Sequence, residues 1–333
     1  MKLNFSNNYY KEKALKINID NQNNHTTTDA FFLLINGLPM EDLSNLCNIM
    51  SQYYKSMPNP INLTMEDCYK LTQKIDLNEL EKKTIEELAY KCIMEGNYLG
   101  SRTISDGKIN TSSWINHCFY SGEVCATLAA NLNLDVELAK TMGMMHDYGR
   151  KFDHTFNHTI IGFESLSDLG WNNEAIATLT HSFVNGGRCC NNEPALDNFY
   201  VDKDGNARWT DDVIKDDITL FLENYKYSEY DILLNIADLM ATDKGIVSPK
   251  ERIEDIATRR VIDPTNRGYF LANTTNTFIN VLQKMNLLNN NIQFIKDDEN
   301  TSIEDITSYF NQVSNYFFDS FSNIRNNLIY KQK

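Results

Sequence analysis

Metal-ligating side chains follow one another along an internal stretch of the chain. They are His117, the adjacent pair His146 and Asp147, His158, His181 and Asp238. Neutral imidazole nitrogens and carboxylate oxygens together suit borderline divalent metals such as iron, manganese or zinc, and this set contains no thiolate. We therefore expect these residues to hold divalent transition metal ions, with iron or manganese favoured.

A helical hairpin can bring the first ligands together. Residues 115–130 have the apolar periodicity of a helix, and residues 136–147 form a second helix for which Asp135 provides the N-cap. Both helices have similar lengths at about 1.5 Å per residue. An antiparallel pair therefore places His117, at the start of the first helix, beside His146 at the end of the second.

The next two helices repeat this arrangement. His158 opens one helix, residues 170–172 interrupt the pattern, and His181 closes the following helix. Asp238 lies on a fifth helix among aliphatic residues, which we expect to bury it. Each of these residues taken alone is more often a hydrogen-bonded core side chain than a ligand, whereas the whole series in this order predicts a metal site.

The residues around the ligands form recognisable motifs. The HD dipeptide stands in Met144-Met-His-Asp-Tyr-Gly-Arg150, and it is followed by His158-Thr-Ile-Ile-Gly162, Thr180-His181 and Ile236-Ala-Asp238. Over residues 114–260, under half of the chain, this pattern resembles the HD-domain superfamily of metal-dependent phosphohydrolases in its two-metal form. Within that superfamily it is similar to the bacterial dinucleoside tetraphosphate hydrolases. The next likeness is to cyclic-dinucleotide phosphodiesterases, which usually carry a histidine where Ser182 stands here.

The resemblance implies a role for each ligand. Asp147 would bridge two divalent metal ions, of which one is held by His117, His146 and Asp238 and the other by His158 and His181. Two such ions acidify a bridging water and neutralise phosphate oxygens during displacement. The resemblance therefore implies hydrolysis by metal-activated hydroxide.

Other residues near the motif are candidates for substrate binding. Arg150 can fork onto a non-bridging phosphate oxygen, with a salt bridge at the helix end as the alternative. Gly149 leaves room for a ligand to approach the helix end. Arg188 and His154 are weaker candidates, for which surface decoration and a plain loop position are the alternatives. His25, in a polar asparagine-rich run, is expected to be solvated.

The predicted fold class is all-α. Residues 106–262 form an HD-domain helical bundle with an insertion at about 186–215, which contains a small β-hairpin turning at Asp204-Gly205. Residues 1–105 form an N-terminal helical region packed on the core, in which residues 1–30 are polar and much of that stretch is loosely ordered. Residues 263–333 form a C-terminal helical region. Its apolar stripe predicts core packing, with a homodimer interface as the second choice: Phe310, Val313, Phe317, Phe321, Ile324 and Leu328.

Composition limits the partners. The net charge of −14 argues against binding of long nucleic acid, because that requires a basic surface. A small phosphorylated substrate, in particular a nucleotide, can still bind where metals and a few cations line the site. No segment has the length of a membrane span and no secretory signal is visible at the start. The odd number of cysteines, 7, indicates reduced thiols, so we expect a cytoplasmic protein without a membrane partner.

We therefore predict a metal-dependent phosphohydrolase that cleaves a phosphodiester or phosphoanhydride bond of a small nucleotide. The alternative is an HD-type di-iron oxygenase acting on a small organic or phosphonate substrate, which would use the same ligands. Tyr120 and Glu123, on the helix of His117, leave that alternative open. A third interpretation is a degenerate domain that binds a nucleotide without cleaving it. The complete ligand set argues against this interpretation.

Overall fold

The computed structural model describes residues 25–35, 113–153, 155–182, 196–259, 264–295 and 301–331. Over these ranges the chain is mostly helical, and its strands form one two-stranded sheet, so the predicted all-α fold class is confirmed. The elements in chain order are α2 (Thr27–Ile35), α6 (Ser113–Leu132), α7 (Val136–Met145), η1 (Tyr148–Lys151), α8 (His158–Asp168), α9 (Asn172–Thr180), β1 (Phe199–Val201), β2 (Ala207–Trp209), α10 (Asp212–Asn224), α11 (Glu229–Asp238), α12 (Pro249–Arg259), α13 (Pro264–Lys284) and α14 (Ile303–Lys331).

Helices α6 and α7 form the predicted antiparallel hairpin. The Asp135 carboxylate caps α7 by accepting hydrogen bonds from the backbone amides of Glu137 and Leu138. The helices approach closely through two glycines, since a Cβ atom added to Gly143 of α7 would lie 2.7 Å from the Cα atom of Gly122 on α6. This contact sets the two helix axes close together, and with them the ligands that the helices carry.

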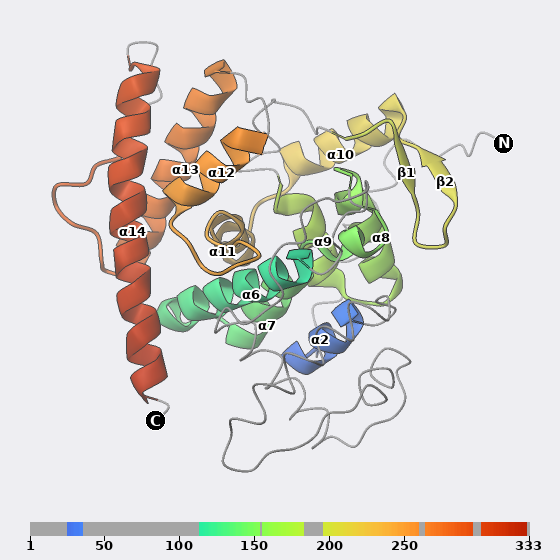
Figure 1. Ribbon diagram of the computed structural model, residues 1–333, viewed down its shortest axis with the longest axis horizontal. Helices are drawn as coiled ribbons and strands as arrows, with labels where there is room; N and C mark the ends of the chain where they lie inside the picture. Colours follow the sequence, from blue (N-terminus) through green and yellow to red (C-terminus); the bar gives the residue numbers. More distant parts are fainter. Residues whose placement is uncertain are drawn as a thin grey trace.

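Two hydrophobic clusters meet at α6. One cluster joins residues of α2, α6, α7, α8, α9, β1 and α10, and the other joins α6, α7 and α9 to α11, α12, α13 and α14. In Figure 1, α6 and α7 lie between α14, at the left, and α8 and α9, at the right. His117 lies on α6, and His146 and His181 are the C-cap residues of α7 and α9, which are the helices that contribute to both clusters; His158 begins α8 and Asp238 ends α11.

The C-terminal stripe packs into the core, as predicted. Phe310, Val313, Phe317 and Phe321 of α14 are almost fully buried, and Phe317 stacks on Phe278 of α13. Ile324 is half-buried against the same cluster. None of the helices in the described part of the chain is long and apolar enough to cross a membrane.

The described part of the N-terminal region packs on the bundle. Helix α2 packs on α7, and the ammonium of Lys151 donates a hydrogen bond to the Leu33 carbonyl in its last turn. The ring of His25, expected to be solvated, stacks on Trp171 with ring centroids 3.9 Å apart. The apolar face of α2 is buried against the bundle, and this burial stabilises the position of the segment. The rest of the predicted N-terminal region lies outside the described residues.

The predicted hairpin is present in the insertion, of which the structure describes residues from 196 onward. Strands β1 and β2 pair antiparallel with Phe199 opposite Trp209, and Gly205 adopts a φ of 80° in the connecting turn. Tyr200 packs into the core, whereas Trp209 is 74% exposed on the other face of the hairpin.

Glu174, in the first turn of α9, gives a prediction about stability. The carboxylate is fully buried, and its Oε1 accepts a hydrogen bond of 2.7 Å from the Thr141 hydroxyl of α7. Burial raises the pKa of Glu174 above its ordinary value. The hydrogen bond from Thr141 opposes this shift without cancelling it. The folded protein therefore holds this proton more tightly than the unfolded chain does, so the free energy of unfolding falls as pH rises above the ordinary glutamate pKa.

Glu174→Gln keeps the acceptor oxygen and removes the ionisation. We expect the variant to gain stability relative to the wild-type protein as pH rises from about 4 to about 8. Urea unfolding at a series of pH values measures this difference. A difference that stays constant with pH would contradict the assignment.

Candidate metal centre

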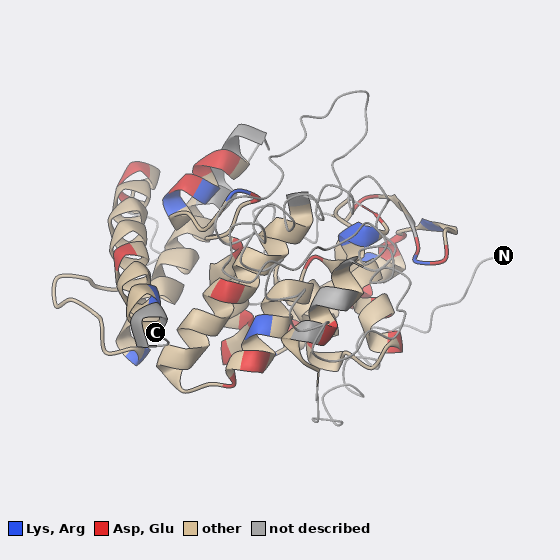
Figure 2. Cartoon of the chain, turned by 60° about the horizontal axis from the view of Figure 1, so that its bottom comes forward, with Lys and Arg blue, Asp and Glu red and all other residues tan. Residues whose placement is uncertain are grey.

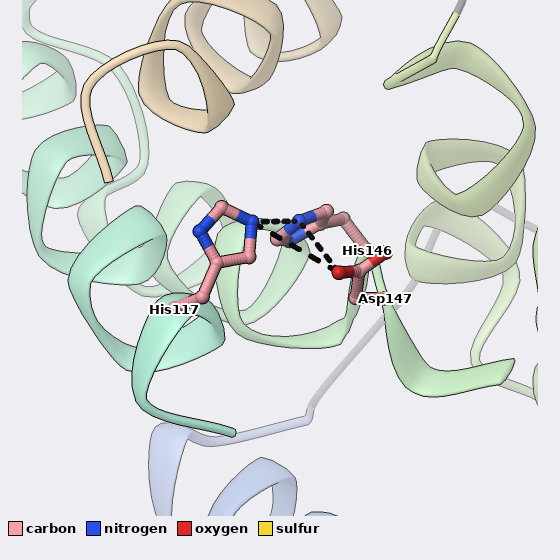
Figure 3. Close-up of side chains that lie close together, drawn as sticks. All are labelled: His117, His146 and Asp147. Atoms are coloured by element: carbon pink, nitrogen blue, oxygen red, sulfur yellow. Dashed lines mark hydrogen bonds and ion pairs between the residues drawn. The ribbon is translucent and has the colours of Figure 1, made fainter. Parts of the chain in front are cut away.

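The first group of predicted ligands joins α6 to the end of α7. His117 lies near the start of α6 and His146 is the C-cap residue of α7. Their Nε2 atoms are 3.1 Å apart, and Asp147 Oδ2 lies 3.9 Å from His117 Nε2 and 3.8 Å from His146 Nε2. In Figure 3 the two imidazoles point toward one another with the carboxylate beside them, and their planes are nearly perpendicular, at 76°.

The second group joins the start of α8 to the end of α9. The Nε2 atoms of His158 and His181 are 3.4 Å apart, and they lie 2.9 Å and 3.5 Å from Asp147 Oδ1. Asp147 therefore presents one carboxylate oxygen to each pair of histidines. The two groups share only this residue.

Asp238, the last residue of α11, lies beside the first group. Its Oδ1 atom is 3.0 Å from His117 Nε2 and 4.0 Å from His146 Nε2. Its side chain is 27% exposed, which corrects the expectation that the apolar helix buries it. The carboxylate sits at the helix end, so it borders the centre rather than the core.

The orientation of all four imidazoles is fixed by backbone carbonyls. The Nδ1 atoms of His146, His158 and His181 lie 2.7, 2.8 and 2.9 Å from the carbonyl oxygens three residues earlier. His117 Nδ1 lies 3.1 Å from the carbonyl oxygen of Ala241, on the segment after α11. A carbonyl only accepts, so each Nδ1 carries the proton and each Nε2 directs a lone pair into the centre. This is the tautomer and the support that metal-bound histidines have.

Burial keeps the imidazoles of His146 and His158 neutral, and the Asp147 carboxylate is ionised. Burial lowers the pKa of His146 to about 3 and that of His158 to about 4. Burial acts to raise the pKa of Asp147, but the Arg150 guanidinium holds it well below its usual range.

The arrangement fits a bound cation. His158 Nε2 carries no proton, so its approach to Asp147 Oδ1 is not a hydrogen bond, and this buried oxygen has no donor among the described residues. Several electron-rich atoms thus converge without hydrogens between them. Ligands that each bond one ion at about 2.0–2.2 Å are roughly 3–4 Å apart, and the observed separations run from 2.9 to 4.0 Å. These buried clusters could hold metal ions.

Two arginines partner the two carboxylates. Arg150, on η1, places its Nε 2.6 Å from Asp147 Oδ2, and its side chain is 24% exposed. Arg252, on α12, donates from Nε to the Asp238 carbonyl at 3.4 Å and has Nη2 3.9 Å from Asp238 Oδ1. The predicted candidate Arg150 is therefore at the centre, paired with a ligand.

Gly149 has a different role from the predicted one. A Cβ atom at this position would lie 1.8 Å from the His158 carbonyl oxygen and 2.8 Å from the Gly162 nitrogen. The glycine therefore admits the backbone of α8, not an incoming ligand. The sequence could not distinguish these uses, because both require the absence of a Cβ atom.

We predict that Gly149→Ala lowers the free energy of unfolding by about 1–3 kcal/mol or more, because rigid backbone must move. It should also weaken metal binding, since His158 shifts with α8. Urea unfolding and metal titration measure the two effects. Gly268→Ala is the matched control, because its new Cβ atom meets only side-chain atoms, those of Ile303 and Ile306, and none nearer than 3.3 Å. Equal stability of the two variants would contradict this packing argument.

Two predicted candidates, His154 and Arg188, lie outside the described residues. From the sequence alone, Arg252 could contact a phosphate or form a salt bridge on a helix surface, and the structure places it beside Asp238, 14 positions earlier in the chain. One residue next to the centre was not predicted as part of it. This residue is Asn157, which directly precedes His158. The only feature of the sequence that marks it is the presence of an asparagine at the start of a predicted helix.

Comparisons with known proteins find short stretches of similarity. The chain is 36% identical over 56 residues to ribonuclease Y 2 of Bdellovibrio bacteriovorus, which covers 16% of the chain and 11% of that protein. It is 36% identical over 64 residues to ribonuclease Y of Thermosipho melanesiensis, covering 19% and 12%. It is 31% identical over 78 residues to an uncharacterized protein of Methanocaldococcus jannaschii, covering 22% and 46%.

These matches span less than half of each relative's length. No family model matches the chain, and no solved structure is significantly similar to it. The local similarity to ribonuclease Y and the buried histidine and aspartate cluster together fit a metal-dependent HD-type domain.

Proposed function

We propose that the protein is a metal-dependent phosphohydrolase that cleaves a phosphodiester or phosphoanhydride bond of a small nucleotide. One observation carries the proposal: Asp147 directs Oδ1 to His158 and His181 and Oδ2 to His117 and His146. A carboxylate shared in this way suits two divalent ions, with Asp238 completing the first group. Iron or manganese matches the donor set of imidazoles and carboxylates.

The residues of the chain divide the work of such a reaction. Divalent ions in a site of this kind supply Lewis acidity and lower the pKa of a water molecule. The backbone carbonyls keep the four histidines in the ligating tautomer. Arg150, 24% exposed and already at the centre, provides a guanidinium that can pair with a non-bridging phosphate oxygen once cations neutralise Asp147.

Charge supports a small substrate over a long nucleic acid. The chain carries a net charge of −14. In Figure 2 the blue segments that mark lysine and arginine are scattered over several elements of the described chain. Backbone binding of a long polyanion needs many such contacts together.

The comparisons favour RNA as a second candidate substrate, because two of the relatives are named ribonucleases. The oxygenase alternative would use the same metal ligands, and it differs from both hydrolase candidates because its reaction requires O₂. One experiment distinguishes all three. Metal-free protein is reloaded with Mn²⁺ or Fe²⁺ and incubated under argon with a dinucleoside tetraphosphate, a cyclic dinucleotide and a single-stranded oligoribonucleotide.

We expect metal-dependent hydrolysis of a small nucleotide without O₂. Preferential cleavage of the oligoribonucleotide would replace the small-nucleotide proposal with the second candidate. Failure of every substrate under argon, combined with O₂ uptake in air on a phosphonate or another organic compound, would favour the oxygenase. The Asp147→Asn protein serves as the blank for contaminating phosphatases.

A further inference from the structure

We propose that Asn157 is a positioning residue that fastens the β1–β2 hairpin to the second group of metal ligands. The inference rests on the two-metal centre proposed above. Asn157 is fully buried at the N-cap position of α8, directly before His158. An asparagine there normally accepts a hydrogen bond from the first helical turn. This side chain makes no such bond, so it serves another purpose.

The Asn157 amide reaches both ends of the hairpin instead. Its Nδ2 atom lies 2.9 Å from the Asp197 carbonyl, 3.3 Å from the Phe199 carbonyl and 2.8 Å from Thr210 Oγ1. Asp197 lies two residues before β1, Phe199 is the first residue of β1, and Thr210 directly follows β2. The preceding amide of Phe156 adds a 2.7 Å hydrogen bond to Asp197 Oδ2. One short turn therefore holds the base of the hairpin.

The same turn orients a ligand. The carbonyl of Thr155 accepts the Nδ1 proton of His158, whose Nε2 atom faces Asp147 Oδ1. Residues 155–157 thus hold the hairpin on one side and the His158 imidazole on the other. A loss of the hairpin contacts frees this turn and with it His158.

The first group of ligands is supported elsewhere. His117 is oriented by the Ala241 carbonyl and His146 by the Gly143 carbonyl, and neither belongs to the turn. The role of Asn157 is therefore selective. Its removal should weaken binding of the ion on the His158 and His181 side and leave the affinity for the other ion unchanged.

Metal titration tests this selectivity without an activity assay. The metal-free protein is titrated with Mn²⁺ in equilibrium dialysis, and both dissociation constants are compared between variants. Asn157→Asp keeps the shape and removes the donor, so we expect one constant to rise by about 10–100-fold, as for other groups that support ligands. In a His181→Ala background, which lacks the second group, Asn157→Asp should change nothing further.

A second pair of variants acts on the other partner. Thr210→Val removes the hydroxyl that accepts from Asn157, and Thr210→Ser keeps it. We expect Thr210→Val to weaken binding of the same ion, but by less than Asn157→Asp does. Thr210→Ser should bind both ions as the wild-type protein does. This pair decides the question if Asn157→Asp does not fold, as judged by circular dichroism.

The outcomes separate the inference from the proposed function. If folded Asn157→Asp binds both Mn²⁺ ions with the affinities of the wild-type protein, the role of Asn157 is overturned and the metal centre still stands. The same holds if Thr210→Val and Thr210→Ser bind the ions with equal affinities. A wild-type protein that binds fewer than two ions would overturn the two-metal centre itself. A selective loss of one ion supports both.

Discussion

Replacing Asp147 by asparagine should abolish binding of both metal ions and lower phosphohydrolase activity on the order of a thousandfold or more. Each oxygen of this carboxylate faces a different pair of histidines, so a single substitution weakens both groups. The fold should persist, because asparagine has the same shape. Its amide can also donate to one of the unprotonated Nε2 atoms that crowd the centre.

Metal content and thermal unfolding measure this prediction separately from activity. An ion at a hundred times its dissociation constant stabilises a folded protein by about 2.7 kcal/mol. Added Mn²⁺ should therefore raise the melting temperature of the wild-type protein and leave that of Asp147→Asn unchanged. Asp168→Asn is the matched control, since Asp168 forms an exposed ion pair with Lys203 away from the centre. Full metal content in folded Asp147→Asn would refute the bridging role.

The ligand geometry was largely predictable because it depends on local rules. The predicted ligands from His117 to His181 lie at or near helix ends, and helix lengths read from apolar periodicity determine which ends meet. Three of the histidines use the carbonyl three residues earlier, which their own segment supplies. The turn at Asp204-Gly205 was predictable for the same reason, since a glycine with positive φ suits a tight hairpin turn.

Features that depend on contacts between distant segments were not predictable. The Ala241 carbonyl that orients His117 is 124 residues away, and no spacing rule links them. The neighbour of Gly149 is the backbone of α8, which the residue type alone does not reveal. The first residues of α2 fell in the polar stretch of residues 1–30, because the sequence does not show the α7 surface that the helix covers.

Arg150→Ala should lower turnover on the order of a hundredfold at saturating metal, by analogy with the loss of one preorganised donor to a developing charge. The guanidinium lies next to the carboxylate between the two ligand groups, at 2.6 Å from Asp147 Oδ2. Arg150 also lowers the pKa of Asp147. Its loss frees the Asp147 carboxylate and removes a positive charge from the centre, so metal affinity changes as well, and the assay must be run over a range of Mn²⁺ concentrations.

That metal dependence distinguishes two roles of Arg150. If the guanidinium contacts the substrate phosphate, the loss of turnover remains at saturating Mn²⁺, and Arg150→Lys recovers only part of it because an ammonium cannot form the fork. Excess Mn²⁺ that restores full turnover to Arg150→Ala would show that Arg150 acts only by holding Asp147. Lys250→Ala is the control for loss of one positive charge, since Lys250 pairs with Glu254 on the surface of α12. Its turnover should equal that of the wild-type protein.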